Sequence, residues 1–348
     1  MNSQRYDGVY VGMDVHRMST TFCIFDPRAD KERQYRTTKC ETSAAAYQRV
    51  LQPFAGRCRV TYEVGTQAQW VAKVVRPLAS EVQTANPSRM PWLFRDGRKN
   101  DRLDARKLAT LLYLDQVPQV HLPSEDVSSW RALIQHRRTV IQRRTRAKNQ
   151  IHAILRSFAL RCPHKSVWTR VGMAWLNRQV FDEARQLMTV NLLADLASIA
   201  RRLKTVEQKL DQIAQRHPGV ALLRTIPGVG PRSAEAIVAY TDELSRFRNR
   251  KQFASYFGMT PTEDSSGQVV RRGRISKRGP SVVRWVLIEA TRMAIRYCPS
   301  LRAWFERVCR DRKDRRKKAV VATGRKILSI CFGMLKTGEV YDARRVTA

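Results

Sequence analysis

The chain has 348 residues, with 65 lysines and arginines against 30 aspartates and glutamates, a formal net charge of +35. A hydrophobic content of 43% with seven tryptophans predicts folded domains rather than a disordered basic tail. So large a charge indicates a polyanionic partner, above all nucleic acid, with an anionic membrane surface as the rival. Because the sequence contains no apolar run of about 18 residues and no signal peptide, we expect no membrane span, no export and a cytoplasmic location.

The cysteines and the charge distribution narrow the class of protein further. The seven cysteines are scattered and never spaced as CxxC, which indicates reduced thiols and excludes a zinc ribbon or a disulfide framework. Residues 1–120 hold 19 basic and 12 acidic residues, a net of +7, whereas residues 121–348 hold 46 and 18, a net of +28. The first part therefore has the charge of an ordinary domain, and the second that of a polyanion-binding body.

The first part of the chain alternates between strand and helix patterns. Apolar, β-branched and aromatic runs at 9–15 and 20–26 predict a hairpin, with a third strand within 31–40. An antiparallel set followed by alternating helices and strands predicts an α/β sheet of about five strands with helices on its faces. The remaining predicted elements are a helix at 43–54, a strand at 58–65, a helix at 67–79, a strand at 81–87 and a helix at 100–115.

Two long helices are predicted next. In the second, apolar residues alternate four and three apart, which is typical of a coiled-coil seam. This seam fits either an intramolecular hairpin with the first helix or a dimerising arm, and the sequence favours neither. The first helix spans 124–160, with an apolar stripe of Leu133, Val140, Ala147, Ile151, Ile154 and Phe158. The seam of the second consists of Leu192, Leu196, Ile199, Leu203, Val206, Leu210 and Ile213.

The first long helix is also strongly basic. We expect these cations to bind a nucleic-acid backbone, although a solvated charged face is the simpler alternative. A second basic run at 307–318 could do the same or form a loop. The cations of the helix are Arg137, Arg138, Arg143, Arg144, Arg146 and Lys148.

A glycine-containing turn divides the helical patterns between 221 and 240. The turn is Pro227-Gly228-Val229-Gly230, and it resembles a helix-hairpin-helix, in which Gly228 and Gly230 would let backbone N–H groups approach a phosphate. A tight connection with no ligand is the alternative. The stretch 262–279 is too polar and glycine-rich for a core element, and helices are predicted again at 282–296 and 320–338.

Four carboxylates are placed where a metal site is expected. Asp14 and Glu63 each close a predicted strand, and Asp101 and Asp104 share one face at the start of a helix. Converging carboxylates repel one another unless a cation neutralises them, and hard oxygen ligands select Mg²⁺ or Mn²⁺ for phosphoryl transfer. Asp101 and Asp104 alone could be ordinary acids at a helix N-terminus. However, Asp14 in an apolar strand favours the metal, and this order of motifs resembles RuvC-type RNase H-like nucleases.

A serine in a basic segment is the second candidate catalytic group. Ser266 precedes Gly267, and its hydroxyl could attack a phosphodiester whose charge nearby arginines neutralise. A flexible turn is the commoner role of such a stretch. Glu263 and Asp264 are close enough in sequence to assist. The basic residues that follow are Arg271, Arg272, Arg274, Lys277 and Arg278.

Taken together, the motifs resemble one family, the DEDD transposases of bacterial insertion sequences, which are RNA-guided recombinases. The resemblance runs in order over nearly the whole chain, and its serine-bearing second half separates it from other RuvC-like nucleases. The stretches that carry it are GMDVH (12–16), YEVGT (62–66), NDRLDARKLA (100–109), IPGVG (226–230), FASYFGMTP (253–261) and SSG with RISKRG (265–279).

The resemblance implies roles for these residues and partners for the chain. Asp14, Glu63, Asp101 and Asp104 match a metal-binding tetrad, and Ser266 matches a serine that bonds covalently to DNA; the adjacent Ser265 departs from the pattern. The implied partners are target and donor DNA, a structured noncoding guide RNA and further copies of the chain, as a dimer or tetramer. Binding to DNA would place the bacterial protein on the nucleoid. The implied domains are a RuvC-like metal-binding domain (1–120), basic long helices with a coiled coil (121–218) and a helical transposase domain (219–348).

Three other functions compete with the recombinase hypothesis. A RuvC-like structure-specific endonuclease would need the four carboxylates but not Ser266. A non-catalytic RNA or DNA scaffold would need only the positive charge and would tolerate the loss of Asp14. A membrane-surface role is disfavoured, because no amphipathic segment stands free of a folded domain.

Overall fold

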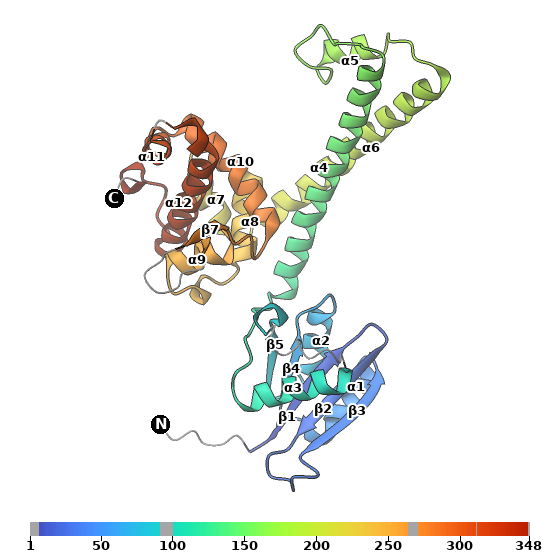
Figure 1. The fold of residues 1–348 in the computed structure, drawn as a ribbon, viewed down its shortest axis with the longest axis vertical. Helices are drawn as coiled ribbons and strands as arrows, with labels where there is room; N and C mark the ends of the chain where they lie inside the picture. The colour runs from blue at the N-terminus through green and yellow to red at the C-terminus, as the bar shows by residue number, and fades with distance from the viewer. Residues whose placement is uncertain (1–6, 91–99, 264–270, 311, 347–348) are drawn as a thin grey trace. The chain divides into compact units, whose positions relative to one another are not determined.

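The computed structural model describes residues 7–90, 100–263, 271–310 and 312–346. The chain divides into two compact units, residues 1–125 and 126–348 (Figure 1). The N-terminal unit combines a sheet with helices, and the C-terminal unit is mainly helical. No helix in the described part of the chain combines the length and the apolar character that a membrane span requires.

The N-terminal unit is built on a five-stranded sheet, as predicted. Its strand order is β3-β2-β1-β4-β5. The first three strands are antiparallel, while β1, β4 and β5 are parallel, so the carboxyl ends of β1 and β4 lie at the same sheet edge. This mixed order is consistent with an RNase H-like domain. The strands are β1 (Val9–Val15), β2 (Ser19–Phe25), β3 (Tyr35–Glu41), β4 (Cys58–Glu63) and β5 (Glu81–Ala85).

Helices cover both faces of this sheet. Because side chains alternate along a strand, Val11 and Met13 of β1 face α1 (Ala44–Leu51) and α2 (Ala68–Val75), in one apolar cluster. Tyr10 faces the opposite side, where α3 (Asp101–Tyr113) lies across the sheet (Figure 1). The even-numbered residues of β1, including Asp14, therefore belong to the α3 face.

The two long helices form an intramolecular hairpin. They are α4 (Glu125–Ser157) and α6 (Glu183–Ala214), joined through the short α5 (Arg170–Leu176), and they cross each other in the view of Figure 1. Part of the predicted seam of α6 packs with α4: Ile199 and Leu203 cluster with Val140, and Leu192 and Leu196 pack against the cluster of Ile151. Within this chain the seam forms a hairpin, the first of the two alternatives, and the dimerising arm stays a prediction.

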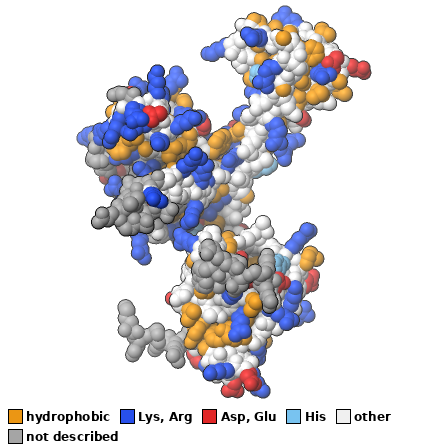
Figure 2. Space-filling view, viewed as in Figure 1, with side chains coloured by type: hydrophobic (Ala, Val, Ile, Leu, Met, Phe, Trp, Pro, Cys, Tyr) orange, Lys and Arg blue, Asp and Glu red, His pale blue; other side chains and the backbone are white. Residues whose placement is uncertain are grey.

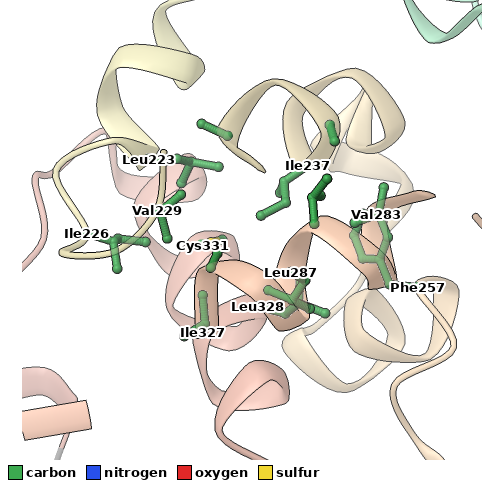
Figure 3. Close-up of a cluster of buried hydrophobic side chains, with 14 of the residues drawn as sticks. Leu223, Ile226, Val229, Ile237, Phe257, Val283, Leu287, Ile327, Leu328 and Cys331 are labelled. Carbon is green, nitrogen blue, oxygen red and sulfur yellow. The ribbon is translucent and has the colours of Figure 1, made fainter. Parts of the chain in front are cut away.

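The remaining helices enclose the core of the C-terminal unit. Figure 3 shows Leu223, Ile237, Leu287 and Leu328 converging from four helices. The stretch predicted to lie outside the core forms a short exposed two-stranded ribbon at β6 (Pro261–Glu263) and β7 (Arg272–Ile275). The helices are α7 (Pro218–Leu223), α8 (Pro231–Thr241), α9 (Arg250–Tyr256), α10 (Ser281–Tyr297), α11 (Pro299–Cys309) and α12 (Arg316–Thr337).

The base of the helical hairpin belongs to the same core. Trp130 and Ile134 of α4 and Leu210 of α6 are buried among the C-terminal helices. The Trp130 ring also stacks on His217, with 4.3 Å between ring centroids. The hairpin is therefore anchored in the C-terminal unit by large apolar side chains.

Candidate metal centre

Asp14 and Glu63 lie at the same edge of the sheet. Met13 pairs with Tyr62 in the parallel register of β1 and β4, so Asp14 and Glu63 each stand one residue beyond that pair. Neighbouring residues in register point to the same face of a sheet, which here is the α3 face. Both carboxylates are half-buried. The sequence expectation that these two strand ends meet agrees with this geometry.

Gly12 allows α3 to lie directly on β1. A Cβ at residue 12 would collide with the carbonyl oxygen of Ala105 and would lie 2.5 Å from the backbone nitrogen of Ala109. Only a residue without a side chain permits so close an approach of helix and strand. Because Gly12 and Asp14 share a face, this contact brings the beginning of α3 over Asp14.

The first turn of α3 carries the other two predicted carboxylates. Asn100 caps the helix by accepting a hydrogen bond from the Arg102 N–H at 3.0 Å. Asp101 and Asp104 follow within the first turn, where the helix dipole stabilises negative charge. Both are partly exposed, so their carboxylates are open to a ligand from solvent.

His16 completes a cluster that sequence reasoning missed. Its Nε2 lies 3.2 Å from Asp14 Oδ2 and 3.4 Å from Asp101 Oδ1. One ligand atom from each of Asp14, His16 and Asp101 lies within 4.8 Å of the others, the spacing of a small cation site. In this arrangement Glu63 and Asp104 lie outside that trio. The feature of the sequence that could have indicated this histidine is its position, two residues after Asp14 and directly after the end of β1.

The electrostatics of the cluster favour a bound cation. Burial raises the pKa of Asp14, His16 opposes this effect, and the charges of Asp101 and Asp104 raise the pKa further. The hydrogen bond from Lys39 Nζ, at 3.2 Å, lowers the pKa of Asp101, and His16 adds to this. Asp14 thus experiences the negative charge of both α3 aspartates. Carboxylate oxygens with one imidazole suit Mn²⁺ well and Mg²⁺ through the oxygens.

The candidate nucleophile lies outside the described residues. Ser266, Ser265 and Asp264 belong to the segment 264–270. The strands on either side of it, β6 and β7, pair with each other, Glu263 opposite Arg272. Of the basic residues that follow, Arg271, Arg274, Lys277 and Arg278 are exposed.

The two glycines of the predicted phosphate turn differ in their surroundings. Gly228 has φ +89°, and a Cβ there would lie 2.6 Å from Cα of Ala294 in α10. Its lack of a side chain therefore serves packing of the turn on a neighbouring helix. Gly230 is the exposed N-cap of α8, and a Cβ there would meet open space. Gly230 is the better placed of the two for a phosphate.

The basic residues of α4 also fall into two groups. Arg137 pairs with Glu207 of α6 at 2.6 Å, and Arg138 donates to Ser281 Oγ at 2.8 Å. Lys148 lies over the Trp168 ring, 4.6 Å from its centroid. By contrast, Arg143, Arg144 and Arg146 are exposed. Only the second group has its charge fully available to a partner.

Sequence comparisons bear on both units. Residues 11–159 match a family described as "Transposase", the DEDD transposases of IS110 elements, and residues 220–306 match the "Transposase IS116/IS110/IS902 family". The "Putative transposase y4qE" of Sinorhizobium fredii (strain NBRC 101917 / NGR234) is 26% identical over 299 residues, 85% of this chain and 74% of the relative. The "Transposase for insertion sequence element IS1111A" of Coxiella burnetii (strain RSA 493 / Nine Mile phase I) is 24% identical, and the match covers 70% of this chain and 68% of the relative. The "Pilin gene-inverting protein" of Moraxella lacunata is 26% identical, and the match covers 36% of this chain and 39% of the relative.

Proposed function

This chain belongs to the IS110-type family of DEDD transposases, and from that premise we propose that it recombines DNA with a divalent metal and a serine nucleophile. The observation that carries the metal part is the convergence of Asp14, His16 and Asp101 within 4.8 Å at the end of β1. Asp14, Glu63, Asp101 and Asp104 are the proposed ligands, with Mg²⁺ or Mn²⁺ as the ion. When bound, the ion would neutralise the negative charge on the phosphodiester oxygens.

Ser266 is the proposed nucleophile of the covalent step. Its Oγ forms a bond to the scissile phosphorus, the bond from phosphorus to the leaving sugar oxygen breaks, and that oxygen takes up a proton. The serine proton passes to a base, for which Glu263 and Asp264 are the nearest carboxylates in sequence. Arg271, Arg272, Arg274, Lys277 and Arg278 are proposed to bind the phosphates around the reaction.

Nucleic acids are the proposed partners of the remaining basic surface. Target and donor DNA are the substrates, and a structured noncoding RNA is proposed as the guide, by resemblance to the family. The net charge of +35 supports a large polyanionic complex but does not distinguish RNA from DNA. Assembly as a dimer or tetramer on DNA is proposed on the same resemblance.

A covalent trapping assay tests this function. Purified protein, the noncoding RNA transcribed from beside its gene, labelled donor and target DNA and Mg²⁺ are incubated and resolved on a denaturing gel. The expected product is a protein–DNA band that disappears in Ser266→Ala and in Asp104→Asn but persists in Ser265→Ala. Ser265→Ala is the matched control, since it changes an identical neighbouring side chain.

The outcome of this assay also decides between the recombinase and the alternative endonuclease. Nicked DNA without a covalent band, unchanged by Ser266→Ala and lost in Asp104→Asn, would assign a metal-dependent nuclease that activates water. A covalent band that is lost in Ser265→Ala instead would move the nucleophile by one residue. Neither nicked DNA nor a covalent band from the unmodified chain, together with nucleic-acid binding that Asp14→Asn leaves unchanged, would contradict both metal-dependent functions and leave a nucleic-acid scaffold.

A further inference from the structure

A groove of about 980 Å³ lies between α10, α11 and α12 of the C-terminal unit. None of the residues lining it belongs to the metal centre, and four of them, Arg312, Lys313, Arg316 and Lys317, lie in the basic run 307–318. Figure 2 shows Lys and Arg side chains around exposed hydrophobic ones over the part of the molecule labelled α10, α11 and α12 in Figure 1. The groove therefore combines a cationic surface with an exposed apolar one.

The rim of the groove is strongly positive. It is lined by seven cationic side chains and one carboxylate, that of Glu306. One of the seven, Arg302, is used inside the fold, because it donates to the carbonyl oxygens of Ile295 and Arg296 at the end of α10. The other six are Arg292, Arg296, Arg312, Lys313, Arg316 and Lys317.

Most of these six charges have no acidic partner among the residues that the structure describes. Arg292 pairs with Glu289 at 2.9 Å and Arg312 with Asp314 at 3.1 Å. Within the described ranges, no carboxylate forms an ion pair with the other four, and all four are exposed. Uncompensated cations held at one groove repel one another, and an anionic ligand relieves this repulsion.

The floor of the groove is apolar. Ile288 and Ile295 of α10 face Val320 and Val321 of α12, and the Phe305 ring of α11 closes one side. The floor residues other than Phe305 are only partly buried, so apolar surface remains exposed at the base of a charged groove. A ligand that carries both charge and flat apolar groups matches this surface.

We propose that this groove binds an unpaired segment of a nucleic-acid strand, with phosphates on the cationic rim and bases against the apolar floor. A single strand offers both groups at once, and exposed bases add binding energy through apolar and stacking contact. A duplex keeps its bases stacked inside and offers only phosphates to such a groove. The choice of nucleic acid as the partner rests on the proposed function, whereas the site itself rests on the groove.

Binding of short oligonucleotides to the full chain tests this site. Fluorescence anisotropy with labelled oligothymidine, oligouridine and a mixed-sequence duplex is measured against salt in EDTA, so that no metal ion bridges the protein and a phosphate. Loss of three rim charges in the variant R296Q/R316Q/K317Q should lower the slope of log K against log salt by about 2 for single strands, at about 0.7 per phosphate contact. The matched control R201Q/R202Q/K209Q removes three exposed charges from α6 and should change the slope by less than half as much.

A second variant tests the floor without changing charge. Val320→Thr keeps the β-branched shape and should weaken single-strand binding roughly fivefold, with the salt slope and the duplex affinity unchanged, since it places a hydroxyl against the bases. A preference for oligouridine would assign the groove to RNA, and one for oligothymidine to DNA. Equal loss in the rim and control variants, or equal weakening of duplex and single strand, would overturn the proposal. Because no strand is cut in this assay, failure of the covalent trapping experiment would leave its result intact.

Discussion

His16 Nε2 lies 3.2 Å from Asp14 Oδ2, two residues apart at the end of β1, and the same nitrogen lies 3.4 Å from Asp101 of α3. This histidine is therefore either a metal ligand or a cationic partner of the two carboxylates. As a ligand it should contribute directly to metal affinity. We expect His16→Gln to weaken Mn²⁺ binding roughly tenfold or more in isothermal titration calorimetry, a loss typical of removing an ordered group at a metal site.

A control variant shows whether replacing a histidine away from the metal centre also changes Mn²⁺ affinity. His136→Gln changes an exposed histidine of α4 and should leave Mn²⁺ affinity unchanged. If His16→Gln bound Mn²⁺ as tightly as the unmodified chain, His16 would be only a charge partner. The ion would then be held by carboxylates alone.

The close approach of α3 to β1 makes a second prediction. Gly12→Ala places a Cβ against the backbone of Ala105 and Ala109, so the helix must move away from the strand. We expect a loss of about 1–3 kcal/mol in the free energy of unfolding, the usual cost of overpacking. Mn²⁺ affinity should fall as well, because Asp101 and Asp104 move with the helix. Calorimetric unfolding and metal titration measure the two effects, with Gly65→Ala as the control because a Cβ there meets open space. Equal stability of the two variants would contradict this account of the contact.

The two groups of basic residues on α4 should respond differently to substitution. Loss of the exposed charges in R143Q/R144Q/R146Q should lower the salt slope of nucleic-acid binding by about 2 and leave the melting temperature unchanged. Arg137→Gln should instead cost about 1 kcal/mol of stability, because it breaks the ion pair with Glu207 at 2.6 Å. Anisotropy and thermal unfolding of both variants check this. A stable Arg137→Gln protein with the larger binding defect would reverse the assignment.

The sheet could be read from the sequence because its patterns are local. Runs rich in apolar, β-branched and aromatic residues predicted the strands, and the parallel register of β1 and β4 then brought Asp14 and Glu63 to one edge. Local patterns also gave both long helices. They did not choose between a hairpin and a dimer, since a coiled-coil seam is equally apolar in either case. Within the chain, long-range packing of Trp130 and Leu210 in the C-terminal core holds the two helices together, and pairing with a second copy stays a prediction.

The candidate site was predictable only in part. Asp14 and Asp101 of the cluster were predicted from a strand end and a helix start, whereas His16 looks in sequence like any polar residue after a strand. Its role depends on α3 lying over Asp14, which Gly12 permits. Gly228 shows the converse: a glycine in a turn suggests space for a phosphate, yet that space is filled by Ala294 of α10. Sequence alone does not tell which atoms approach a glycine.

A buried glutamate gives the last prediction, on the pH dependence of stability. Glu235 of α8 is only 1% exposed, and its Oε1 lies 3.0 Å from Arg232 Nη1. Burial raises the pKa of Glu235 to about 7, although Arg232 opposes this effect. A carboxyl whose pKa is higher in the folded chain favours folding below its ordinary value of 4.5, and this contribution is lost as the pH rises through about 7. The full difference corresponds to about 3 kcal/mol.

Glu235→Gln should therefore change the free energy of unfolding by an amount that depends on pH, and not by the same amount at every pH. At pH 5 the variant should be about as stable as the unmodified chain, since the glutamate is then largely protonated. At pH 8 the variant should be more stable by about 2–3 kcal/mol, because the unmodified chain must keep a buried carboxylate ionised or take up a proton. Urea unfolding at the two pH values measures this, with the exposed Glu243→Gln as the control. A stability difference of equal size at both pH values would mean that the ion pair with Arg232, and not burial, governs the ionisation of Glu235.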